Sequence, residues 1–277
     1  MERLQEAMSR ARARREDTLG KQPAERAPGG ARAPSAPADD GVWERLKPLD
    51  VNERLLKSNR VVAFFGGKPA QPFDMMRTKI MKQAAANGWR RLVVTSPGPR
   101  CGKTTLAANL AFSLARQSEL RVLVVEVDMR RPQMSGVLGI RENVAFARYM
   151  SGEDPDYAPH MVRHGANLAF ACNTVPAGNS SELLHSTGAR DRLDELERTF
   201  QPDLVVFDAP PVLPSDDALA FLDYADCALI VAAAEQTSIN EIDVTEAEVA
   251  GATNVLGVVL NKSRYSQGSD AYNDAYY

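Results

Sequence analysis

The chain has 277 residues, a formal net charge of −3 at pH 7 and three cysteines. This length exceeds that of a typical single domain, but it fits one large α/β domain with tails. The nearly balanced charge gives no global electrostatic case for a nucleic-acid partner or for binding to a membrane surface. Cys101, Cys172 and Cys227 lie far apart and lack the spacing of a metal site, which is typical of a protein in the reducing cytosol.

Residues 1–59 differ in composition from the rest of the chain. The segment is rich in Arg and then in Pro and Ala, so it carries too little apolar surface to fold alone, and we expect a flexible tail. A short helix over residues 3–15 that docks on an anionic membrane or a partner is the alternative. The start has no apolar core of the kind a signal peptide needs, and no apolar run approaches membrane-spanning length. Trp43, Leu46 and residues 51–56 bring apolar side chains back, and we expect a short helix there that leads into the domain.

Apolar strand patterns alternate with helix patterns over the predicted domain, residues 60–264. A short strand is predicted at 60–65 and a helix at 72–86. The later strands are short and rich in Val with little alternation, which is typical of strands buried on both faces. We expect these strands at 92–95, 122–127, 168–171, 204–207, 227–232 and 255–260, and helices at 103–117, 189–200, 215–223 and 239–251. The order predicts an α/β fold with a doubly wound, mostly parallel sheet that binds ligands at the carboxyl ends of its strands.

The segment TSPGPRCGKTT at residues 95–105 joins the strand at 92–95 to the next helix. A loop in this position presents backbone N–H groups to an anion, and the helix dipole adds to the attraction. Lys103 is placed to reach the outer phosphates of a nucleotide, and Thr104 to put its hydroxyl on Mg²⁺. The residues expected to bind the nucleotide in this loop are Gly98, Pro99, Arg100, Cys101, Gly102, Lys103, Thr104 and Thr105. Pro97 stands where the usual pattern has its first Gly, so a Gly-Pro turn before a helix is the alternative.

Acidic residues end two of the later strands. Glu126 and Asp128 follow one buried strand and point the same way, because strand side chains repeat every two residues. Asp208 ends the strand at 204–207 and is expected to orient the metal. Acids beside a triphosphate can hold Mg²⁺ through water and accept a proton from an incoming hydroxyl. For a single acid at a strand end, capping of the next helix is the alternative.

Three segments resemble the Walker-type motifs of bacterial tyrosine kinases, which serve capsule and exopolysaccharide synthesis. They are SPGPRCGKTT at 96–105, VDMRRP at 127–132 and FDAPP at 207–211, and the likeness covers about residues 60–264. The resemblance implies a P-loop NTPase-like fold with ATP and Mg²⁺ as cofactors. It gives catalytic roles to Lys103, Asp128, Asp208 and Glu126, and a metal site to Thr104, Asp128 and Asp208. Asn261 follows the last strand, where related folds contact the base, and a turn that ends the strand is the alternative.

The last predicted region, residues 265–277, resembles the tyrosine-rich tail of this family. The expected phosphoacceptors are Tyr265, Tyr272, Tyr276 and Tyr277; a disordered tail without this role is the alternative. The resemblance therefore implies an ATP-dependent protein-tyrosine kinase that autophosphorylates its tail and regulates polysaccharide polymerisation or export. It further implies a cytoplasmic protein at the inner face of the plasma membrane, held there by a separate membrane-anchored chain-length regulator. A homo-oligomer and a cognate tyrosine phosphatase complete the expected partners.

The chain departs from the family pattern at several positions. Arg100 stands where Gly is common, and it resists the positive φ that Gly permits unless it adds a cationic contact to the nucleotide. Glu126 replaces an Asp, and Gln71 and Asp74 replace the Glu and Arg of the ring-forming motif, which leaves ring assembly open. Two other functions are therefore considered. One is a partitioning or division-site ATPase switch, although that group has a Lys where this chain has Gly98; the other is an inactive scaffold of a polysaccharide complex.

Overall fold

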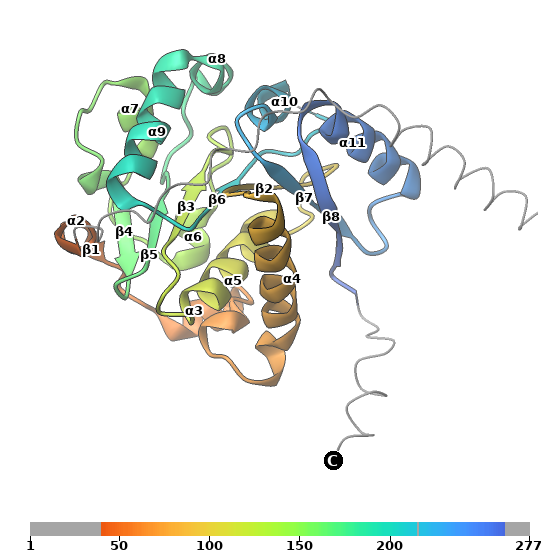
Figure 1. The fold of residues 1–277 in the computed structure, drawn as a ribbon, viewed down its shortest axis with the longest axis horizontal. Helices are drawn as coiled ribbons and strands as arrows, with labels where there is room; N and C mark the ends of the chain where they lie inside the picture. Colours follow the sequence, from red (N-terminus) through yellow and green to blue (C-terminus); the bar gives the residue numbers. More distant parts are fainter. Residues whose placement is uncertain (1–39, 215, 264–277) are drawn as a thin grey trace, which may run out of the picture. The chain divides into compact units, whose positions relative to one another are not determined.

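A computed structural model describes residues 40–214 and 216–263, all of which lie in one compact unit of the chain. Its centre is an eight-stranded sheet in the order β1-β4-β5-β3-β6-β2-β7-β8 (Figure 1). The strands are β1 (Lys47–Pro48), β2 (Arg91–Thr95), β3 (Val122–Glu126), β4 (Met161–His164), β5 (Leu168–Ala171), β6 (Leu204–Asp208), β7 (Cys227–Ala233) and β8 (Asn254–Asn261). Every neighbouring pair is parallel except β4 with β5. The predicted doubly wound, mostly parallel α/β sheet is therefore confirmed.

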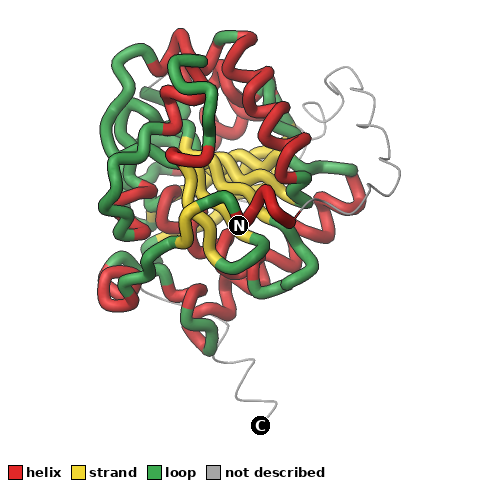
Figure 2. The backbone as a smooth tube through the Cα atoms, turned by 90° about the vertical axis from the view of Figure 1, so that its left-hand side faces the viewer, coloured by secondary structure: helices red, strands yellow, loops and turns green. Residues whose placement is uncertain are grey.

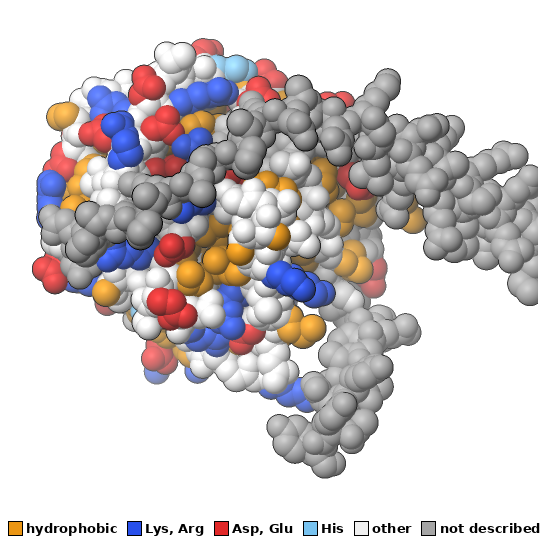
Figure 3. Space-filling model, in the orientation of Figure 1, with side chains coloured by type: hydrophobic (Ala, Val, Ile, Leu, Met, Phe, Trp, Pro, Cys, Tyr) orange, Lys and Arg blue, Asp and Glu red, His pale blue; other side chains and the backbone are white. Residues whose placement is uncertain are grey.

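Helices cover both faces of the sheet, as Figures 1 and 2 show. They are α2 (Asp40–Glu44), α3 (Glu53–Ser58), α4 (Gln71–Asn87), α5 (Lys103–Ala115), α6 (Met134–Leu138), α7 (Phe146–Ser151), α8 (Ser180–His185), α9 (Thr187–Phe200), α10 (Asp216–Leu222) and α11 (Ile239–Ala252). Within residues 40–214 and 216–263, no helix combines the length and apolarity needed to cross a membrane. On the face seen in Figure 3, basic and acidic side chains are interspersed.

The central strand β3 shows why its sequence lacks alternation. All of its residues are buried, and its four apolar residues divide between two apolar clusters. Leu123 and Val125 pack on the face covered by α7, α9 and α10, while Val122 and Val124 pack on the face covered by α4, α5 and α6. A strand covered on both faces needs apolar residues at every position. The Val-rich runs therefore predicted the position of the strands in the middle of the molecule.

The segment at residues 60–65 was predicted as a strand, and this prediction is wrong. It forms a single 3₁₀ turn, Val62–Phe64, after Arg60 at a φ of +60°. The buried side chain of Asn109, from α5, accepts the Ala63 N–H at 2.9 Å and donates to the Arg60 carbonyl at 2.9 Å. One side chain thus satisfies backbone groups that a strand would pair with a neighbour. The apolar pattern reflects burial against α5, which residue type alone does not distinguish from burial in a sheet.

Strand β4 was not predicted, because only half of Met161–His164 is apolar. It pairs antiparallel with β5 and carries β1 at the edge of the sheet. Its first two residues are buried and its last two are partly exposed. A short antiparallel strand near an edge does not need the continuous apolar run of a central parallel strand.

Residues 40–59, which lie before the expected start of the domain at residue 60, pack into the core. Trp43 is 2% exposed, and its ring meets that of Phe200 edge to face with centroids 5.2 Å apart. Its indole N–H donates to the Phe200 carbonyl at 3.3 Å. Leu56 of α3, the short helix expected in this region, is fully buried in the other apolar cluster. The apolar core therefore contains residues from both sides of residue 60. Residues 1–39 and the tyrosine-rich segment 265–277 lie outside the described residues.

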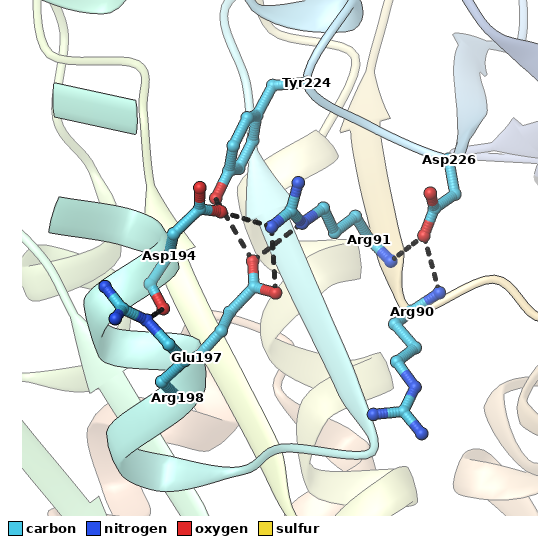
Figure 4. Close-up of polar contacts among 7 residues, drawn as sticks. All are labelled: Arg90, Arg91, Asp194, Glu197, Arg198, Tyr224 and Asp226. Atoms are coloured by element: carbon cyan, nitrogen blue, oxygen red, sulfur yellow. Dashed lines mark hydrogen bonds and ion pairs between the residues drawn. The ribbon is translucent and has the colours of Figure 1, made fainter. Parts of the chain in front are cut away.

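A polar cluster connects the amino end of β2 to α9 through hydrogen bonds and ion pairs (Figure 4). The Arg91 guanidinium donates to Glu197 at 2.8 Å and lies 3.9 Å from the centre of the Tyr224 ring. The Tyr224 hydroxyl donates to Asp194 at 2.7 Å. Asp226 accepts the backbone N–H of Arg91 at 2.8 Å. These contacts fix the start of a central strand at the opposite end of the sheet from the carboxyl ends, where a ligand is expected.

Replacement of Trp43 tests whether residues 40–59 belong to the folded domain. Trp43→Ala should lower the free energy of unfolding by about 3–5 kcal/mol, because it removes a large buried ring and a buried hydrogen bond. Trp43→Phe, the matched control, keeps an aromatic ring and should cost roughly 1–2 kcal/mol. Urea unfolding followed by circular dichroism measures both values. A Trp43→Ala protein as stable as wild type would contradict the packing described.

Candidate nucleotide site

The segment between β2 and α5 forms a closely packed loop at the carboxyl end of the sheet. Gly102 has a φ of +90°, and a Cβ atom built there would lie 2.3 Å from Nδ2 of Asn261. Asn261, at the end of β8, donates from that nitrogen to the Cys101 carbonyl at 2.8 Å. Only glycine combines this φ with so close an approach. Asn261 thus supports the loop from the side, and its contact with a nucleotide base stays a prediction.

Arg100 adopts the positive φ that its side chain was expected to resist. Its φ is +63°, and the residue is exposed. The neighbouring Cys101 is buried and donates to the Gly98 carbonyl at 3.3 Å, and the Ser96 hydroxyl donates to the same carbonyl at 2.7 Å. A non-glycine residue in this region costs on the order of 1 kcal/mol, so the surrounding contacts hold a strained loop.

Lys103 is the first residue of α5 and points toward the acids of the neighbouring strands. Its Nζ lies 2.9 Å from Oδ2 of Asp128, and the residue is only 9% exposed. Burial disfavours the charged form, but the carboxylates of Asp208 and Asp128 outweigh it, so the pKa of Lys103 is raised. The lysine is therefore held as a cation at the amino end of a helix, which is where a phosphate group binds most favourably.

Asp208, at the end of β6, is fully buried. Neither carboxylate oxygen has a hydrogen-bond partner among the described residues. Burial raises its pKa to about 6, and the nearby charge of Lys103 and hydroxyl of Thr104 offset only part of that rise. Unpartnered carboxylate oxygens beside a hydroxyl are ligands that Mg²⁺ prefers. The predicted metal residues Thr104, Asp128 and Asp208 are thus brought together around Lys103, and they fit a magnesium ion.

Glu126 pairs in register with Asp208, but its carboxylate is used differently. One oxygen accepts the backbone N–H groups of Gln133 at 2.6 Å and Met134 at 2.8 Å, and the other accepts that of Asn173 at 2.9 Å. Burial, and then the charge of Asp208, raise the pKa of Glu126 to about 7 against the effect of these hydrogen bonds. Glu126 and Asp128 lie two residues apart, yet only Asp128 contacts Lys103.

Arg130 lies beside the site and was not predicted as one of its residues. Its guanidinium contacts Asp217 at 2.6 Å and donates to the Ser180 hydroxyl at 3.1 Å. Asp217 is 1% exposed, and Ser180 donates to it at 3.1 Å. The contacts join the segment after β3 to α8 and α10. The sequence feature that could have identified Arg130 as a residue near the site is its position two residues after Asp128.

The described geometry places a helix start, a buried lysine and two acids at the carboxyl ends of neighbouring strands. The family model described as CobQ/CobB/MinD/ParA nucleotide binding domain matches residues 92–276. The chain belongs to this nucleotide-binding family. The matched region contains the loop, the acids and the strand ends described above. The predicted P-loop NTPase-like fold and the nucleotide-binding role are therefore confirmed.

Curated relatives within this family are named as tyrosine kinases. The chain is 27% identical to the putative tyrosine-protein kinase CapB of Staphylococcus aureus, over 73% of this chain and 88% of that protein. It is 32% identical to the putative tyrosine-protein kinase EpsB of Ralstonia nicotianae and 28% identical to the tyrosine-protein kinase ptk of Acinetobacter johnsonii. The match covers 70% of this chain and 26% of EpsB, and 67% of this chain and 25% of ptk. The chain thus spans about a quarter of these two longer relatives.

Two solved structures are also similar to this chain. The crystal structure of the chimerical protein CapA2B2 has a TM-score of 0.64 and 27% identity, covering 71% of this chain and 86% of that one. The kinase domain of the Escherichia coli tyrosine kinase ETK has the same fold, with a TM-score of 0.62 and 24% identity over 72% of this chain and 80% of that one. The resemblance to bacterial tyrosine kinases found in the three motifs is confirmed by these comparisons.

The raised pKa of Asp208 predicts how the stability of the nucleotide-free protein depends on pH. Folding raises the pKa from 3.8 to about 6, so this carboxyl group stabilises the folded state at low pH, and the contribution is lost as pH rises through about 6. Between about pH 5 and pH 7.5, Asp208→Asn should therefore lose roughly 1 kcal/mol less stability than wild type. Urea unfolding of both proteins at the two pH values measures the difference. Parallel pH profiles would show that Asp208 is not the buried titrating group described.

Proposed function

We propose that this chain is an ATP- and Mg²⁺-dependent protein-tyrosine kinase. The single observation that carries the proposal is the buried Lys103–Asp128 pair at the start of α5, next to the Asp208 carboxylate, which has no hydrogen-bond partner among the described residues. The names of the relatives, several of which match over most of their length, support the kinase class over other nucleotide-binding activities. The reaction is the in-line transfer of the γ-phosphoryl group of ATP to a tyrosine hydroxyl.

In this mechanism Lys103 exchanges its partner when ATP binds. Its ammonium contacts the β- and γ-phosphates, which releases the carboxylate of Asp128 from the ion pair. Thr104 and Asp208 would hold the magnesium ion, and the ion would supply positive charge that neutralises the phosphates. Asp128 then takes the phenol proton as the tyrosine oxygen bonds to the γ-phosphorus and the bond to the ADP oxygen breaks. An ordinary tyrosine titrates near pH 10, so the transfer requires such a base close to neutral pH.

The proposed acceptors are Tyr265, Tyr272, Tyr276 and Tyr277, in a polar segment that also contains Ser, Gly, Asp and Asn. The proposal includes a role in the polymerisation or export of a capsule or exopolysaccharide, supported by relatives named in such loci. Its partners would be a separate membrane-anchored activator that places the chain at the inner face of the membrane, and a tyrosine phosphatase. A similar solved structure is that of the chimerical protein CapA2B2, whose name supports a search for such an activator.

The proposal also includes assembly of several copies, with its geometry left open. Asp74, at the position of the family's ring-forming motif, is tied within the chain by an ion pair with Arg116 and a hydrogen bond from the Ser113 hydroxyl at 2.6 Å. Arg77 donates to the Ser113 carbonyl at 2.8 Å. These side chains of α4 therefore already have partners in the last turn of α5 and just after it. An interface through this helix would compete with those contacts.

The second candidate is an ATPase switch of the partitioning or division-site type. The observation that favours it is the match to the family model that includes MinD and ParA. Such a switch would hydrolyse ATP without forming phosphotyrosine, whereas an inactive scaffold would do neither. Incubation of the purified full-length chain with ATP and Mg²⁺, followed by detection of both ADP and phosphotyrosine, separates the three functions.

Replacement of Lys103 tests the proposed site. Lys103→Ala should lower autophosphorylation by about 100-fold or more, because the contact with the transferring phosphoryl group is lost. Lys79→Ala, which removes an exposed lysine on α4, is the matched control and should leave the rate unchanged. Phosphotyrosine is quantified by mass spectrometry of the intact chain. Normal phosphorylation of the Lys103→Ala protein would exclude the site.

Mixing two variants tests transfer between copies. One chain carries Lys103→Ala with its tail intact, and the other is active but has phenylalanine at the four tail tyrosines. An extended segment spans at most about 3.3–3.6 Å per residue, so thirteen residues reach roughly 40 Å, enough to enter the site of a second copy. Phosphate is expected on the inactive chain. If the wild type phosphorylates itself but the inactive chain stays unmodified in the mixture, transfer occurs within one copy.

A further inference from the structure

We infer that Glu126 is a positioning residue that shapes the loop carrying Asp128, and that it is not a ligand of the metal or the nucleotide. The inference deepens the proposed function and rests on it, because it assigns the second acid of the same site a different role. Each of the two carboxylate oxygens of Glu126 accepts at least one backbone N–H group.

Glu126 lies just before the loop of residues 127–134, and its carboxylate closes this loop by binding the last residues of the loop. Glu126 is the last residue of β3 and is fully buried. Its Oε1 accepts the backbone N–H groups of Gln133, the residue before α6, and of Met134, the first residue of α6, at 2.6 and 2.8 Å. These groups have no partner within the helix, so the carboxylate caps α6 from the end of a strand seven residues earlier.

The other oxygen ties the same loop to the segment after β5. Oε2 accepts the Asn173 N–H at 2.9 Å, and the Asn173 carbonyl in turn accepts the hydroxyl of Ser135, on α6, at 2.8 Å. The side chain of Asn173 accepts the N–H of Ala147 at 2.9 Å, which extends the network to α7. A single buried carboxylate thus joins the ends of two strands and the start of a helix.

Asp128 lies inside the loop that Glu126 closes. The backbone N–H groups of Val127 and Asp128 both donate to the Asp208 carbonyl, at 2.9 and 3.1 Å, so the loop leaves the sheet fixed against β6. Asp128 then accepts the Arg131 N–H at 3.3 Å with one oxygen and contacts Lys103 with the other. With both ends of the loop fixed, the Asp128 carboxylate has a defined place opposite Lys103.

The chemistry of glutamate suits this role. Three N–H donors arrive from two directions, and the two oxygens of the carboxyl group accept them, one oxygen facing each direction. Glutamine offers one acceptor oxygen and one donor group, so Glu126→Gln must leave at least one buried N–H group without a partner. Aspartate is shorter by one carbon–carbon bond of about 1.5 Å, so it would not reach both groups of donors at hydrogen-bond distance.

The test compares Glu126→Gln with a control that loses similar hydrogen bonds elsewhere. Asn167→Ala removes a side chain that donates to the carbonyls of Ala115, Gln117 and Leu120 at 2.9–3.1 Å, at the amino ends of the strands. Amide hydrogen exchange is measured on the nucleotide-free full-length proteins. Glu126→Gln should speed exchange at Gln133, Met134 or Asn173 by about 10-fold or more, whereas Asn167→Ala should leave these amides as in wild type.

Kinetics then separate positioning from metal binding. Glu126→Gln should lower the rate of phosphoryl transfer at saturating ATP by about 10-fold or more, with the Mg²⁺ concentration for half-maximal rate within about twofold of wild type. Asp208→Asn, the comparison for a proposed metal residue, should raise that concentration. Asn167→Ala should keep the wild-type rate.

Two outcomes of these kinetic measurements would contradict the inference. A rise in the Mg²⁺ requirement of Glu126→Gln as large as that of Asp208→Asn would make Glu126 a ligand. Equal losses of rate in Glu126→Gln and Asn167→Ala would make its role only structural. If Glu126→Gln does not fold, exchange in the wild type decides, because fast exchange at Asn173 would contradict the network. If wild type transfers no phosphate, the proposed function fails, and the exchange of the three amides alone decides the role of Glu126.

Discussion

The structure depends on the burial of one cation and three carboxyl groups at the carboxyl edge of the central strands. Moving charged groups out of water is costly, and a pair such as Lys103 and Asp128 offsets that cost only when its geometry is held closely. Asp208 has no hydrogen-bond partner among the described residues, and Glu126 is surrounded by backbone donors. Strands that are buried on both faces, and fixed at their far ends by contacts such as those of Arg91, provide the rigidity that this arrangement requires.

Within the site, the charge of Lys103 is balanced by acids, whereas the buried carboxylate of Asp208 has no hydrogen-bond partner among the described residues. Lys103 has its pKa raised by two acids, while Asp208 has its pKa raised chiefly by burial. A divalent cation beside Asp208 would favour its charged form and so lower that pKa, whereas phosphates beside Lys103 would favour the ammonium as the two acids already do. A buried acid that is poorly compensated gains more from a bound cation, and a cation that also contacts the phosphates would couple the binding of metal and nucleotide. This coupling suits an enzyme that must hold ATP and Mg²⁺ together.

The departures from the kinase motifs are each accommodated by local contacts. Arg100 takes a positive φ within a loop fixed by Ser96, Cys101 and Asn261. Glu126 uses the additional length of its side chain to reach two segments beyond the sheet. Asp74 pairs with Arg116 inside the chain. The first two changes leave Lys103, Asp128 and Asp208 together.

The sequence by itself determined the central strands and helices, the α/β class and the place of the nucleotide loop. These features depend on local patterns: Val-rich runs for strands buried on both faces, and the spacing of a Gly-Lys-Thr-Thr segment between a strand and a helix. The strand ends also located Asp128 and Asp208, because parallel strands bring their carboxyl ends to one edge of the sheet.

Only the tertiary structure decided what depends on contacts between residues distant in the chain. The segment at 60–65 is a turn because Asn109, on another element, satisfies its backbone. From their two-residue spacing in the sequence, Glu126 and Asp128 could both be metal ligands. In the structure, Asn173 and the start of α6 supply donors that only Glu126 reaches. Hydrogen bonds act over about 3 Å whatever the sequence separation, so the partner of a buried polar group is known only once the chain has folded.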